Sequence, residues 1–312
     1  MIRFGRRERP APVTEPTFGE RPSVAVVTVV RNEGEMLRVW CEHYAKHVGA
    51  DALLIFDDNS ADGSTERARA DGYSVHRIPG FPGGAGFEQA RIALVSGIAT
   101  GLLAVYDYVV FTDADEFLVP DPTRYPDLPA FLGAHRDDKI VAGLGLNIVH
   151  AVGEEAPLDL SRPILEQRSY ASFAPLMCKP AAKRVPAPWW SASHGIRGAY
   201  RVDPGLFMLH LKFADIDRLE AVAAERHAAS RADGRAGKSS WGRPSDELVR
   251  ALRNNVDADA VAAAREFDPS ALDLAALVLH EGELYRAPRV GQLASLRSEP
   301  VVRVPARLRG SL

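Results

Sequence analysis

Short apolar runs and helix-like stretches alternate along the first 120 residues of the chain. The apolar runs are rich in β-branched and aromatic residues, as buried strands are, and occupy residues 23–30, 52–56, 73–78 and 106–111. Helices are predicted between them, two amphipathic ones at 36–48 and 87–102 and a short polar one at 62–70. This order predicts an α/β fold with a mainly parallel sheet and helices on both faces.

Polar clusters follow three of the four predicted strands, at residues 28–33, 57–60 and 113–116. Ligands of parallel sheets bind outside the carboxyl ends of the strands, so the topology alone predicts a binding site at this edge. The Gly/Pro loop at 80–86 has neither spacing of a phosphate-binding loop and is expected to be a connector.

The third cluster contains three acids in four positions, Asp113, Asp115 and Glu116. Carboxylates two positions apart on an extended chain point to the same side, so Asp113 and Asp115 could bind one divalent cation. An acidic turn that caps the next segment accounts for the same residues, and the residues alone leave both interpretations open.

Composition narrows the class of protein. The 312 residues are 46% apolar and carry 38 basic against 41 acidic residues, a net charge of −3 that argues against nucleic acid as a partner. Two cysteines indicate a reducing compartment. No apolar run reaches the roughly 20 residues of a transmembrane helix, so the expected location is cytoplasmic. The basic residues in 1–21 allow a weak peripheral contact with the inner membrane.

The second half is expected to continue with strands at 139–149 and 206–213, followed by a helical extension at 216–285. Its helices are predicted at 219–229, 245–254, 256–267 and 272–283. The Gly/Ser-rich break at 231–244 is either a linker or a lid. Residues 1–21 and 286–312 lack periodicity and are expected to be flexible tails.

Four segments occur in a specific order: VVTVVRNEGEMLRVWCEHYAKHVGAD, LLIFDDNSADGS, FEQARIALVSGI and YDYVVFTDADEFLVP. In this order they resemble the nucleotide-sugar-binding half of an inverting GT-A glycosyltransferase of the family 2 type. The D-x-D-E-F-L form, with a preceding helix rich in His, Tyr and Trp, resembles the branch close to family 92. The resemblance implies a catalytic domain at 22–215, with a nucleotide-sugar-binding half at 22–122 and an acceptor half at 123–215.

The resemblance also implies roles for individual residues on the donor side. The residues expected to contact the nucleotide sugar are Thr28, Val30, Arg31, Asp57 or Asp58, Arg91, Asp113 and Ala114. Asp115 would bind Mn²⁺ or Mg²⁺ directly, and Asp113 would contact the ribose or a metal-bound water. His210 would complete the metal site, although a histidine within a strand is equally explained as a hydrogen-bonded structural residue.

On the acceptor side, Lys179, Trp189, Trp190 and His194 lie in an irregular segment that the resemblance makes a candidate acceptor or phosphate wall. Sugar rings stack on aromatic faces, whereas both tryptophans could also pack in the core. An inverting transfer needs a general base. The Glu-Asp pair typical of family 2 is missing. Glu154, Glu155 and Asp203 are the available acids, none is singled out by its context, and Glu154 and Asp203 are taken as candidates.

Together these features predict a metal-dependent glycosyltransferase that uses a nucleoside-diphosphate sugar, with a UDP-sugar as first candidate, and a glycan or lipid-linked acceptor. A nucleotidyltransferase is the alternative enzyme, although the first strand lacks the Gly-rich loop typical of one. A non-catalytic module that binds sugar nucleotides or glycans is the third interpretation.

Overall fold

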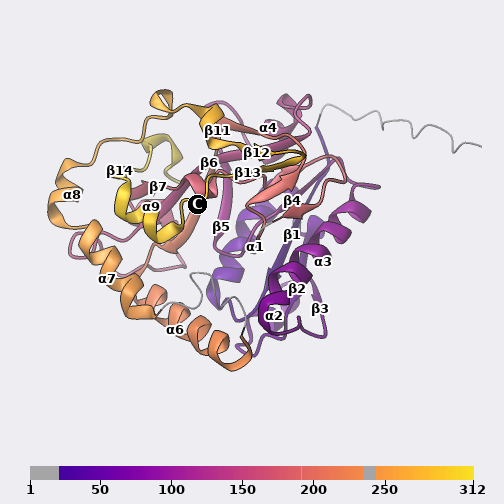
Figure 1. Cartoon of the computed structure of the whole chain (residues 1–312), viewed down its shortest axis with the longest axis horizontal. Coiled ribbons are helices and arrows are strands. Elements are labelled where there is room, and N and C mark those ends of the chain that lie inside the picture. The colour runs from indigo at the N-terminus through magenta and orange to yellow at the C-terminus, as the bar shows by residue number, and fades with distance from the viewer. Residues whose placement is uncertain (1–20, 191, 235–243) are drawn as a thin grey trace, which may run out of the picture.

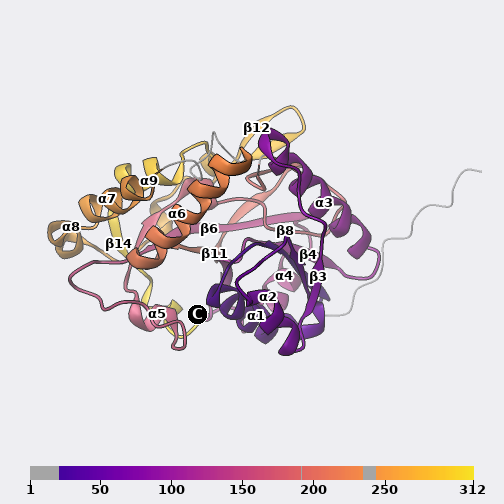
Figure 2. The same ribbon diagram turned by 90° about the horizontal axis from the view of Figure 1, so that it is seen from below.

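The computed structural model describes residues 21–190, 192–234 and 244–312. Its first half follows the predicted alternation: β1 (Val24–Val30), α1 (Glu35–Val48), β2 (Leu53–Asp57), α2 (Ser64–Ala70), β3 (Ser74–Arg77), α3 (Phe87–Leu102) and β4 (Tyr108–Phe111). These strands are parallel, in the order β3-β2-β1-β4 (Figure 1). The chain moves outward to β3 and returns to β4, so right-handed crossovers place α1 and α2 on one face and α3 on the other (Figure 2).

The second half extends this sheet with mixed pairing. Its elements are β5 (Glu116–Pro120), α4 (Leu128–Ala134), β6 (Ile140–Val149), α5 (Ile164–Gln167), β7 (Tyr170–Phe173), β8 (Ala182–Lys183) and β11 (Arg201–Phe213). The described strands are ordered β14-β7-β6-β8-β4-β1-β2-β3, and β11 joins the sheet between β6 and β5. The predicted fold class, an α/β protein with a mostly parallel central sheet, is confirmed.

A smaller antiparallel sheet lies beside the first one. It consists of β9 (Trp189–Trp190), β10 (Gly195–Arg197), β12 (Leu279–Glu281) and β13 (Leu284–Arg286), in the order β12-β13-β10-β9. The predicted helix at 272–283 is therefore wrong, because this stretch contains only a 3₁₀ turn (Leu274–Leu277) before the chain pairs as β12.

The C-terminal helices are α6 (Ile216–Asp233), α7 (Ser245–Asn255), α8 (Ala258–Ala263) and α9 (Gln292–Ser298). They share an apolar cluster that packs against Val149 and Phe213 at the ends of β6 and β11. The helix predicted at 256–267 ends early, at Ala263. The expected N-terminal tail, apart from residue 21, lies outside the described residues, as do residues 235–243 of the proposed lid or linker.

The expectation of a flexible tail at 286–312 is wrong. These residues form α9 and β14 (Val301–Arg303), and β14 pairs with β7 in the main sheet. Leu308 is fully buried in the core. Elements of this length are too short to show a periodic pattern. They form because pairing and packing with distant parts of the chain stabilise them.

Buried strands surround the sheet edge where the polar clusters meet. Every residue of β6 is buried, as are all residues of β4 and β5. Within the ranges given above, no helix has both the length and the apolar character needed to cross a membrane.

Candidate metal and anion site

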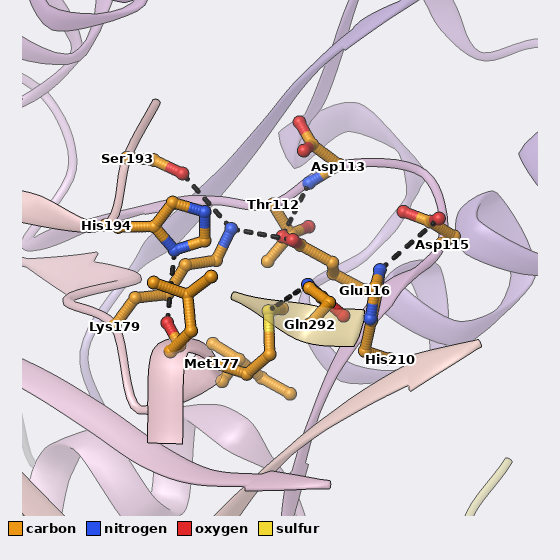
Figure 3. Close-up of polar contacts among 12 residues, drawn as sticks. Thr112, Asp113, Asp115, Glu116, Met177, Lys179, Ser193, His194, His210 and Gln292 are labelled. Atoms are coloured by element: carbon orange, nitrogen blue, oxygen red, sulfur yellow. Dashed lines mark hydrogen bonds and ion pairs between the residues drawn. The ribbon is translucent and has the colours of Figure 1, made fainter. Parts of the chain in front are cut away.

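The turn from β4 to β5 presents the acidic cluster at the carboxyl end of β4. The backbone N–H of Asp113 donates to Glu116 Oε2 (3.0 Å), which closes the turn and orients Glu116 inward (Figure 3). Strand β11 runs antiparallel to β5 and places His210 directly opposite Glu116. As a result His210 Nε2 lies 3.5 Å from Asp115 Oδ2, although the two residues are far apart in sequence.

Asp115, Glu116 and His210 form a group that can hold a metal ion. One ligand atom from each lies within 4.8 Å of the others, and all three residues are buried. Carboxylate oxygens are ligands for Mg²⁺ and Mn²⁺, and the imidazole favours Mn²⁺ of the two. The structure thus brings the predicted ligands Asp115 and His210 together, and Glu116 is a third possible ligand beside them. Asp113, the third predicted ligand, lies outside the group because its Oδ1 accepts a hydrogen bond from Arg91 (2.7 Å).

Two cations compensate the acids at the turn. Lys179 Nζ lies 2.6 Å from Glu116 Oε1 and also donates to Ser193 Oγ (3.1 Å). Burial raises the pKa of Glu116, and Lys179 offsets only part of this effect. Burial acts on Asp113 in the same sense, but Arg91 and Lys179 outweigh it and lower the pKa of Asp113.

Helix α6 supplies a second group of cations. Arg218 and Arg226 line a pocket together with Asp115 and Lys212. Their guanidinium nitrogens lie 3.8 and 3.7 Å from the carboxylate of Glu33, in the loop after β1. Burial raises the pKa of Glu33 to about 7, against the opposing effect of Arg226.

The pKa of Asp115 responds to the same surroundings. Burial opposes its ionisation, but His210, and beyond it Arg226 and Arg218, lower the pKa far below its usual range. Asp115 is therefore an anion at neutral pH, as a metal ligand must be.

The expected nucleotide contacts occupy different environments. Thr28 and Val30 are fully buried within β1, whereas the side chain of Arg31 is 41% exposed and lies 3.8 Å from Asp58. Asp57 accepts hydrogen bonds from the Ser60 backbone and the Thr65 hydroxyl, which tie the loop after β2 to α2 without capping that helix. Asp58 accepts from the backbone of Phe81, and Ala114 is buried in the acidic turn.

The two adjacent tryptophans differ in burial. Trp189 is buried, donates its indole N–H to Pro180 O (2.7 Å) and has Lys183 Nζ 3.8 Å from its ring centroid. Its expected role in an acceptor wall is wrong, because the ring belongs to the core. Trp190 is 50% exposed, with Arg197 over its ring.

His194 and Lys179 lie beside the acidic turn, as Figure 3 shows. His194 Nδ1 is 3.1 Å from Leu176 O, and burial with the nearby Lys179 lowers the pKa of His194 to about 3. His194 is therefore neutral at physiological pH.

Of the two candidate bases, Asp203 is excluded. It lies near the opposite end of β11 from His210, about 20 Å away along the strand. There it accepts from Arg201 (2.9 Å) and from the backbone of Gly205 (2.8 Å), which is a structural role. Glu154 is exposed in the loop after β6 and stays a candidate.

The sequence interpretation missed Glu33, Asn147, Lys212, Arg218 and Arg226. Arg226 lies in the helix predicted at 219–229 and Arg218 directly before it. A spacing of eight residues falls within one broad helical face, but only the packing of α6 places that face beside Asp115.

No family model and no curated protein matches the sequence. Among solved structures, glucosyl-3-phosphoglycerate synthase from Mycobacterium tuberculosis in complex with Mn²⁺, UDP and glucosyl-3-phosphoglycerate is 24% identical, over 40% of this chain and 44% of that one, with a TM-score of 0.28. A further structure, that of a mycobacterial protein, is 21% identical over 44% of this chain and 48% of that one, with a TM-score of 0.30. The matched part thus spans less than half of each of these chains, and at these scores the match assigns no function.

Proposed function

We propose that this chain is a metal-dependent glycosyltransferase that transfers a sugar from a nucleoside-diphosphate donor to an acceptor hydroxyl. The balance of charge at the site carries the proposal. Five carboxylates meet five cations here: Asp113 and Glu88 with Arg91, Glu116 with Lys179, and Glu33 and Asp115 with Arg218, Arg226 and Lys212. A divalent ion beside Asp115 and His210 would leave a surplus of positive charge, which a diphosphate neutralises.

The residues that would hold the ion are Asp115 and His210, with Glu116 and Asp113 around them. When bound, the metal would supply Lewis-acid stabilisation of the charge that develops on the leaving diphosphate. Arg218, Arg226 and Lys212 face the same pocket and would bind phosphate oxygens. Arg91 holds Asp113 in place through its 2.7 Å contact.

The nucleotide would lie along the edge formed by the ends of β1 and β2, beside Arg31 and Asp58. We take a UDP-sugar as the first candidate donor. The acceptor would be a glycan or glycolipid, with the exposed ring of Trp190 as a stacking surface for a sugar. Direct attack by the acceptor hydroxyl would invert the anomeric centre, and Glu154 is the candidate base.

The donor site is tested by thermal unfolding with UDP, GDP, CDP and dTDP, each with and without Mn²⁺. At least one nucleotide should raise the Tm only when Mn²⁺ is present. Asp115→Asn should abolish this rise, whereas Asp51→Asn, which changes an exposed carboxylate after α1, should keep it. Failure of all four nucleotides to give a metal-dependent shift would refute the proposed donor site.

Product analysis separates the competing functions. A glycosyltransferase releases a nucleoside diphosphate from the sugar nucleotide, slowly even with water as acceptor. A nucleotidyltransferase would instead join a nucleoside triphosphate to a sugar phosphate and release pyrophosphate from the triphosphate. Binding without either product would indicate a module that lacks turnover.

A further inference from the structure

A row of four buried polar residues crosses the sheet and ends at the candidate metal site. Strand pairing places Ser172 of β7 opposite Asn147 of β6, Asn147 opposite His210 of β11, and His210 opposite Glu116 of β5. Each is at most 4% exposed. Residues directly opposite one another on neighbouring strands share a face of the sheet, so the row is continuous from Ser172 to the acidic turn.

Asn147 is the unexpected member of this row. It is the only polar side chain in the ten residues of β6, IVAGLGLNIV, and is completely buried. A buried amide costs stability unless its polar atoms are hydrogen-bonded. Its Oδ1 lies 2.8 Å from His210 Nδ1, while its Nδ2 has no hydrogen-bond partner within the described part of the chain. The amide is thus half satisfied, and its one contact is with His210.

That contact determines which nitrogen of a neutral His210 carries hydrogen. An amide oxygen only accepts hydrogen bonds, so His210 Nδ1 must be the donor. In the neutral ring the lone pair is then on Nε2. The same atom lies 3.5 Å from Asp115 Oδ2, where a protonated ring pairs with the carboxylate, and a metal ion bound there would take the place of that hydrogen. If the amide were turned over, its NH₂ group would donate to Nδ1, and the hydrogen on Nε2 would block metal binding.

We propose that Asn147 is a positioning residue that holds His210 as its Nδ1–H tautomer, with the Nε2 lone pair directed at a divalent ion bound by Asp115. The inference rests on the proposed function, because it presumes a metal at this site. Outer partners of this kind fix the ring orientation of metal-binding histidines in general, and their loss weakens metal affinity about 10–100-fold.

The test uses Mn²⁺ alone with the full chain, and its affinity is measured by titration followed by electron paramagnetic resonance. Asn147→Leu removes the acceptor and keeps the volume, so Mn²⁺ should bind about 10–100-fold more weakly. Asn147→Asp keeps an acceptor oxygen and should bind close to wild type. Ser172→Ala is the matched control, because it changes the next residue of the row and should leave the affinity unchanged.

A second readout needs no metal. Nitrogen NMR of the histidine rings in the metal-free protein, assigned with His210→Ala, should show His210 protonated on Nδ1 in the wild type. In Asn147→Leu the population should shift toward Nε2–H. A mere packing role for Asn147 would lower the Tm without changing the tautomer.

The two proposals fail in different ways. If the wild type does not bind Mn²⁺, or His210→Ala binds it equally well, the proposed metal site is wrong. If His210→Ala loses affinity but Asn147→Leu does not, only the positioning role is overturned. Should Asn147→Leu fail to fold, the wild-type ring decides, and a His210 with hydrogen on Nε2 but none on Nδ1 overturns the inference.

Discussion

Lys183 should make the stability of this protein depend on pH in the alkaline range. Its side chain is fully buried in β8, in the middle of the main sheet, and its Nζ donates to Ala187 O (2.6 Å). Burial lowers the pKa of Lys183 from 10.5 to about 7. The folded state thus releases this proton at a lower pH than the unfolded chain.

The direction in which stability changes with pH follows from the number of protons bound in the folded and the unfolded state. Between pH 7 and 10.5 the unfolded state holds more protons at Lys183, so stability rises with pH by up to about 1.4 kcal/mol per unit. From pH 7 to 9.5 the contribution amounts to about 3 kcal/mol. Lys183→Met removes this titration and keeps most of the packing against Trp189.

Urea unfolding of both proteins at several pH values between 6.5 and 9.5 measures the effect. The stability of Lys183→Met relative to wild type should be highest near pH 7 and fall by about 3 kcal/mol toward pH 9.5. Lys46→Met, at an exposed position of α1, should show no such trend. A difference between Lys183→Met and wild type that stays constant across the range would refute a neutral, buried Lys183.

Three further changes test the site and its support. Lys179→Met should lower the free energy of unfolding by about 3–5 kcal/mol at neutral pH, because it leaves the buried Glu116 unpaired. The double variant Lys179→Met/Glu116→Gln should recover most of this loss. Equal stability of the single and double variants would contradict the reasoning. Gly145→Ala should destabilise the protein by about 1–3 kcal/mol, because the added Cβ would lie 2.4 Å from Ala174 O. Gly97→Ala, in open space on α3, should stabilise the protein slightly. Chemical denaturation of both variants measures the two effects. Arg226→Gln should weaken Mn²⁺-dependent binding of the nucleoside diphosphate, measured by calorimetry, about 10-fold or more. Arg231→Gln, at an exposed position of the same helix, should leave this affinity unchanged. Equal losses in the two variants would contradict a role of α6 in the site.

The C-terminal part of the chain shows where sequence patterns stop being informative. Residues 286–312 carry no periodicity, yet β14 completes one edge of the main sheet, and Gln292 of α9 contacts Met177 next to the acidic turn (Figure 3). Strands of three residues bury little by themselves and form only because a partner strand is present. The predicted helix at 272–283 fails for the same reason, since pairing with β13 overrides the local preference.

The sequence alone determined the alternating half of the protein, because its strands are apolar runs rich in β-branched and aromatic residues and its two long helices show helical spacing. From that order the position of Asp113, Asp115 and Glu116 at the carboxyl edge of the sheet follows without coordinates. Only the tertiary structure decided what faces these acids. The register of β11 brings His210 to Asp115 and leaves Asp203 at the far end, and the packing of α6 adds Arg218 and Arg226. Even Trp189 and Trp190 separate into core and surface, because neighbouring residues of a strand point to opposite faces and only the surrounding chain decides which face is buried.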